Sequence, residues 1–82
     1  MRFSYRTQGT CASQIDFDLN DNIISNVQFK GGCNGNLQGI SRLVEGARAE
    51  EVIERLSGIR CGFKQTSCPD QLSHALKAAL EQ

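Results

Sequence analysis

The 82-residue sequence has no tryptophan, one tyrosine and one proline, and it carries no net charge, since nine basic residues balance nine acidic ones. Without an excess of positive charge, we expect no nucleic-acid partner. No stretch of about 18 apolar residues occurs, so we expect no membrane-spanning helix and no membrane partner. The first residues also lack the apolar core of a secretory signal, which predicts a cytoplasmic protein.

The small size of the chain also limits its core. We expect a single domain over residues 1–82, because most domains have roughly 50 to 250 residues. Below about 70–80 residues a core rarely supplies more than about 3–5 kcal/mol, and small domains often add a metal ion or disulfides. The sequence contains four cysteines. Their role is therefore the main functional question.

Two kinds of pattern divide the chain. Residues 2–30 predict three antiparallel strands, most clearly at 14–19, where apolar and polar residues alternate. The last of these strands is expected to place Ile23, Val27 and Phe29 on one face. Residues 36–82 show three helical repeats of apolar residues. We therefore predict an α+β fold, a three-stranded antiparallel meander followed by three helices packed on one face.

The hairpin formed by the second and third strands brings two cysteines together. If its turn centres on Asp21, residues whose numbers sum to about 42 lie opposite one another. Phe17 then pairs with Ser25, and Cys11 and Cys33 emerge at the same end of the hairpin.

The other two cysteines lie close to the start of the last helix. Cys68 falls at or beside the N-cap, because Pro69 suits the first helical position. Cys61 lies seven residues earlier in the preceding loop. Loops and helix ends are where ligands can converge, so we expect Cys11, Cys33, Cys61 and Cys68 to meet at one end of the molecule.

Four interpretations of these cysteines are open. They are small apolar residues with no joint role, or they form disulfides, or one pair, Cys61 with Cys68 or Cys11 with Cys33, cycles between dithiol and disulfide. The fourth is a tetrahedral thiolate site for zinc or an iron–sulfur centre, although no C-x₂-C motif is present. Zinc binding supplies about 10–16 kcal/mol in small domains. This magnitude favours the metal site.

No other residues predict catalysis. The sequence has no phosphate-binding loop and no Ser/His/Asp arrangement. His74 lies off the apolar face of its helix and is expected to be a solvated surface residue. We do not expect a stand-alone enzyme.

The string Thr66-Ser67-Cys68-Pro69-Asp70 resembles the motif that names the TSCPD domain, and residues 31–40 and 60–62 look like the small stand-alone branch of that family. The likeness covers essentially the whole chain. TSCPD domains are otherwise C-terminal pieces of cobalamin-dependent ribonucleotide reductases. The resemblance implies an accessory module for metal binding or thiol relay, linked to deoxyribonucleotide synthesis, with ribonucleotide reductase or another protein as partner. The chain has no room for the reductase's own barrel and nucleotide sites.

The order of elements is also similar to that of the IscU/NifU iron–sulfur scaffolds. In that family three cysteines, helped by an aspartate and a histidine, hold zinc or a nascent cluster, and Cys11, Cys33 and Cys68 match them by order and element. This chain lacks the matching aspartate and histidine, while Cys61 is additional. A fourth thiolate in place of exchangeable ligands favours a closed zinc site. An iron–sulfur scaffold or carrier is the alternative function.

Overall fold

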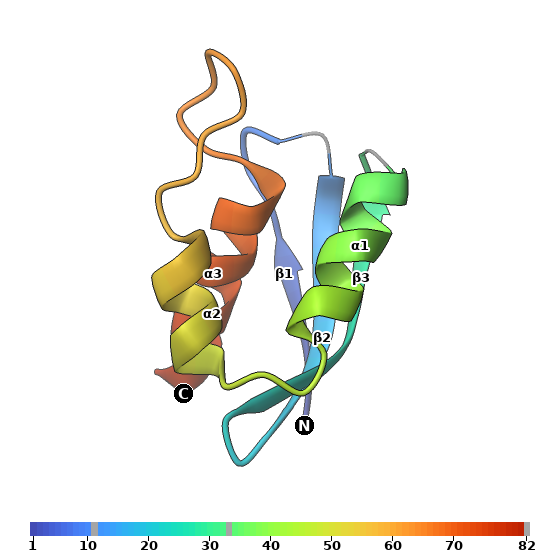
Figure 1. Cartoon of the computed structure of the whole chain (residues 1–82), viewed down its shortest axis with the longest axis vertical. Helices are drawn as coiled ribbons and strands as arrows, with labels where there is room; N and C mark the ends of the chain where they lie inside the picture. Colours follow the sequence, from blue (N-terminus) through green and yellow to red (C-terminus); the bar gives the residue numbers. More distant parts are fainter. Residues whose placement is uncertain (11, 33, 82) are drawn as a thin grey trace.

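The computed structural model describes residues 1–10, 12–32 and 34–81, and shows a sheet followed by helices (Figure 1). This order confirms the predicted α+β class. The elements are β1 (Arg2–Arg6), β2 (Ala12–Asn20), β3 (Ile23–Gly31), α1 (Asn34–Val44), α2 (Ala49–Leu56) and α3 (Cys68–Leu80).

The three strands form an antiparallel meander in the order β1-β2-β3. The β2–β3 hairpin turns through Asp21 and Asn22, whose φ angles of 52° and 64° are both positive. Asn20 therefore pairs with Ile23. A two-residue turn with both central residues left-handed suits the right-handed twist of a hairpin.

The predicted register of this hairpin is wrong, because the turn has two residues and because β3 contains a bulge. Asp18 pairs with Ser25, but Asp16 pairs with Gln28, so β3 has one extra residue between these pairs. Asn26 lies in that interval with φ of 52°, a conformation typical of a bulge.

The bulge also changes which residues of β3 reach the core. Ile24 and Val27 are buried at 0% and 6% exposure, whereas Ile23 is only half-buried. Strict alternation would put Ile24 and Val27 on opposite faces, and the extra residue between them brings both to the helix side.

The helices cover one face of the sheet. Figure 1 shows α1 beside β3 and α2 beside α3, and the packing contacts join α1 to β3, α2 to α3, and α3 to β2. The buried apolar side chains of sheet and helices form one core: Ile15, Phe17, Ile24, Val27, Val44, Ala49, Val52, Leu72, Ala75, Leu76 and Ala79.

The helix α3 provides the largest helical share of this core. Leu72, Ala75, Leu76 and Ala79 are all buried, and their spacing of i, i+3, i+4 and i+7 defines one helical face. None of the helices in the described ranges has the length and apolar character that crossing a bilayer requires.

Candidate functional site

The first turn of α3 is organised by the side chain of Ser67. Ser67 is the N-cap, and its hydroxyl accepts a hydrogen bond from the Asp70 N–H at 3.2 Å. The same hydroxyl donates to the carbonyl of Ile59 at 2.6 Å. One side chain therefore satisfies a free N–H of the helix and ties the helix start to the loop that precedes it.

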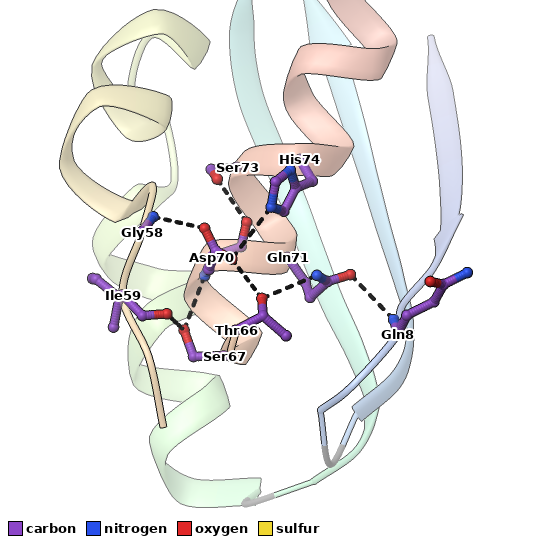
Figure 2. A network of polar contacts seen from close by, with 9 residues as sticks. All are labelled: Gln8, Gly58, Ile59, Thr66, Ser67, Asp70, Gln71, Ser73 and His74. Atoms are coloured by element: carbon purple, nitrogen blue, oxygen red, sulfur yellow. Dashed lines mark hydrogen bonds and ion pairs between the residues drawn. The ribbon is translucent and has the colours of Figure 1, made fainter. Parts of the chain in front are cut away.

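Asp70 is the centre of a buried polar network (Figure 2). The residue is 5% exposed, and its carboxylate accepts hydrogen bonds from the Gly58 N–H at 2.7 Å and from the Thr66 hydroxyl at 2.5 Å. His74 Nε2 lies 3.2 Å from the same carboxylate. Burial raises the pKa of Asp70, but the bonds from Thr66 and Gly58 and the charge of His74 outweigh burial, so the pKa lies below its ordinary value.

The network continues from α3 to the connection between β1 and β2. Gln71 donates from Nε2 to the Thr66 hydroxyl at 3.0 Å, and its Oε1 accepts the Gln8 N–H at 3.1 Å (Figure 2). A Cβ at Gly9 would lie 3.1 Å from the methyl group of Thr66. The β1–β2 connection therefore lies directly against the residues that precede α3.

Two cysteines line one hollow beside this network. Cys68 is half-buried and Cys61 is exposed, and both are free thiols. The hollow has a volume of about 550 Å³, and its other walls include Leu37, Ile40 and Leu43 of α1 and Ile59 of the loop. The structure thus brings together two of the four predicted ligands.

Tight local hydrogen bonds hold the loop that carries Cys61. The Cys61 N–H donates to the Thr66 carbonyl at 3.2 Å, and the Lys64 N–H donates to the Cys61 carbonyl at 3.0 Å. These bonds fold residues 61–66 back on themselves. The Cys61 position is therefore tied through the backbone to the residue that contacts Asp70.

Cys11 and Cys33 lie outside the described residues. Their neighbours do approach one another: Ala12 pairs with Gly31, and a Cβ at Gly32 would lie 3.2 Å from the Ala12 nitrogen. Within the described ranges, no group of three or more His, Cys, Asp or Glu residues could hold a metal ion. The four-cysteine site therefore stays a prediction.

The sequence pattern predicts Cys68 at the helix start, which the structure confirms, but it assigns no role to Asp70. His74 is exposed as expected, with 47% of its side chain accessible, yet it contacts the buried Asp70 carboxylate. The spacing of Ser67 and Asp70, three positions apart before an apolar repeat, resembles a capping box and is the signal that could have revealed the network.

The comparisons with known proteins agree with this motif. A family model described as "TSCPD domain" matches residues 2–80, nearly the whole chain. Searches among curated proteins and among solved structures give no match. The likeness to iron–sulfur scaffolds therefore stays a prediction.

Proposed function

Because the chain belongs to the TSCPD domain family, we propose that it is a non-catalytic accessory module that binds one zinc ion and serves a ribonucleotide reductase in deoxyribonucleotide synthesis. The observation that supports zinc binding is the common hollow of Cys61 and Cys68. The link to the reductase rests on the family, because TSCPD domains also occur as C-terminal pieces of that enzyme.

The donors at this end of the molecule suit zinc. Thiolates are soft ligands, and a closed zinc site uses four of them or a mixture with histidine. Cys61 and Cys68 are two candidate ligands. Cys11 precedes Ala12 and Cys33 follows Gly32 in the sequence, and Ala12 and Gly32 are described residues that lie close together. Bound zinc would supply a structural cross-link between the loop before α3 and the open end of the hairpin.

Such a cross-link would add to the backbone hydrogen bonds that hold the loop before α3. Every residue from 59 to 65 is exposed, so burial of apolar surface contributes little to its order. A thiolate-bound ion at Cys61 would hold the loop without a larger core. The exposure of Cys61 distinguishes it from a buried thiol with no joint role.

Metal analysis of the full chain after anaerobic purification tests the proposal. We expect about one zinc per chain and no absorbance band near ~400 nm, since zinc is a d¹⁰ ion. Cys61→Ser and Cys68→Ser should each lower the zinc content, whereas the matched control Gln65→Ser, on the same exposed loop, should not. Iron with sulfide in place of zinc would overturn the proposal in favour of an iron–sulfur scaffold.

Thiol relay is the second candidate function, and the exposure of Cys61 beside the half-buried Cys68 favours it. In that function the two thiols form a disulfide when a disulfide of the partner is reduced, and the two electrons and two protons pass to the partner's cysteines. Mass spectrometry of metal-free protein decides between the functions. A Cys61–Cys68 disulfide that forms with an oxidised dithiol peptide and is reversed by reductant supports relay.

The partner is tested separately from the metal. We expect the zinc-loaded chain to bind purified ribonucleotide reductase in sedimentation or calorimetric experiments. Absence of binding, with the zinc content intact, would contradict the reductase link while leaving the metal site in place.

A further inference from the structure

The strand β3 forms one edge of the sheet, and an edge strand presents backbone groups that its own sheet does not pair. The beginning of this edge is covered. Ile24 exchanges hydrogen bonds with the α1–α2 connection, at 2.9 Å to the Ala47 carbonyl and 2.8 Å from the Gly46 N–H. The Glu45 carboxylate accepts the Asn26 N–H at 2.9 Å. After Asn26, β2 is the strand that pairs with β3 in the described structure.

A groove of about 610 Å³ follows this later part of the edge, between β3 and α1. Six consecutive residues of β3, 26–31, line it. Successive residues of a strand point to opposite faces, so an unbroken run of lining residues indicates the edge of the sheet. The opposite wall is one side of α1, formed by Leu37, Gln38, Ser41, Arg42 and Glu45.

We propose that this groove binds an extended peptide of a partner protein, which adds a fourth strand along β3 from about residue 27 to residue 31 and places an acidic side chain beside Arg42. Strand addition at a sheet edge is a common mode of peptide recognition, in which the main chain supplies affinity and alternate side chains supply specificity. This groove shares Leu37 with the hollow that contains Cys61 and Cys68 but includes neither cysteine, so the proposal does not require a bound metal.

The groove is lined by charges of both signs, and one of them, Arg42, is available to an acidic side chain of a peptide. Glu45 is already engaged by the Asn26 N–H, and Lys30 lies 3.8 Å from the Asp16 carboxylate. Arg42 is exposed, and its guanidinium makes no hydrogen bond or ion pair with the described part of the chain. Its charge is therefore available to a carboxylate that enters the groove.

A second copy of this chain fits the edge less well than a peptide does. Paired strands lie about 4.7–4.9 Å apart, whereas packed helices need about 8–10 Å between their axes. The helix α1 packs on β3 and would accompany it into a dimer, crowding α1 of the other copy. A bare extended segment brings no helix with it.

The probe for this proposal is a labelled synthetic peptide of about eight residues, alternating valine and threonine, with one central glutamate. We expect it to bind the full-length protein and to shift NMR signals of residues 27–31 and of α1. Two further peptides carry N-methyl groups on alternate amides, one set on odd and the other on even positions. Since only one set of amides faces β3, one methylated peptide should lose binding and the other should retain it.

A charge reversal tests the position of the acidic side chain. We expect Arg42→Glu to weaken binding of the glutamate peptide about two- to fivefold, as for an exposed ion pair, and to favour a peptide with lysine at that position. Arg55→Glu, an equally exposed change on α2, is the matched control and should leave both affinities unchanged.

Three results would overturn the proposal. The first is equal binding of both methylated peptides, and the second is a shift pattern confined to β1, the other sheet edge. The third is the same shifts at β3 in concentrated protein without peptide, together with a dimer in sedimentation, which would assign the edge to a second copy.

Discussion

The first turn of α3 and the loop before it differ sharply although they are adjacent in sequence. Ser67, Asp70 and Ser73 are buried, with exposed fractions of 4%, 5% and 0%, and each is hydrogen-bonded. In contrast, every residue from 59 to 65 is exposed, including the apolar Ile59 and Phe63. One free cysteine lies in each region.

The residues of the motif at positions 66–70 have two different roles. Thr66, Ser67 and Asp70 fix the backbone through their hydrogen bonds. Cys68 has a free thiol and lines the hollow. Cys68 therefore has a position determined by the helix, whereas Cys61 has a position determined by a short run of loop hydrogen bonds. The following substitutions test this difference between the first turn of α3 and the loop before it.

Removing the Asp70 carboxylate should have the largest effect. Asp70→Ala leaves the Gly58 N–H and the Thr66 hydroxyl without an acceptor, which should lower the free energy of unfolding by about 2–4 kcal/mol. Urea denaturation in the presence of a chelator measures this loss. Glu54→Ala, an exposed change on α2, is the control; equal stability of the two variants would contradict the role of the network.

Ser67→Ala should have a smaller effect. It removes the N-cap and leaves the Ile59 carbonyl without its donor, for an expected loss of about 1–2 kcal/mol in the free energy of unfolding. Ser67→Thr keeps a hydroxyl at the cap and should recover most of the loss. If alanine and threonine are equally destabilising, the hydroxyl is not the stabilising group.

The pH dependence should reveal part of the Asp70 contribution. A lowered pKa means that this contribution is complete above the unfolded pKa of about 3.9 and is lost as pH falls through the lower folded pKa. The difference in unfolding free energy between the wild type and Asp70→Asn should therefore shrink as the pH is lowered from about 5 to 2.

Two other carboxylates, at Asp16 and Asp18, also have lowered pKa values, mainly through hydrogen bonds from Gln14 and Asn26 respectively. Both titrate in the wild type and in Asp70→Asn, so their effects cancel in the difference. A difference that stays constant with pH would contradict the charged form of Asp70 as the stabilising one.

Phe63→Ser should have the smallest effect. The Phe63 ring is fully exposed, so its loss should change the free energy of unfolding by less than about 0.5 kcal/mol. Thermal unfolding checks this value. A clear destabilisation would show that the loop packs against the rest of the domain, and the contrast with α3 would then disappear.

The elements of this fold could be predicted from the sequence, but their register could not. Alternation and helical repeats identify the strands and helices because burial acts on side chains of one face. The bulge at Asn26 depends on a left-handed backbone conformation, which the alternation of apolar and polar residues does not predict. Because of the bulge, Ile24 and Val27 are both in the core.

The candidate site could also be predicted only in part from the sequence. Pro69 placed Cys68 near the helix start, because proline fits the first turn of a helix, and the structure agrees. The bond from Gly58 to Asp70 spans 12 positions and joins a loop to a helix. Such a contact depends on tertiary packing, which the spacing of residues does not encode.

The burial of α3 also has a consequence for how the chain is made. Its core residues, Leu72 to Ala79, form one core with Ile15 and Phe17 of the sheet, which precedes α3 in the chain and is therefore synthesised before it. Synthesis proceeds from the N-terminus at about 5–20 residues per second. The part of the apolar sheet face that α3 covers therefore stays open to water and to chaperones until α3 itself has been synthesised.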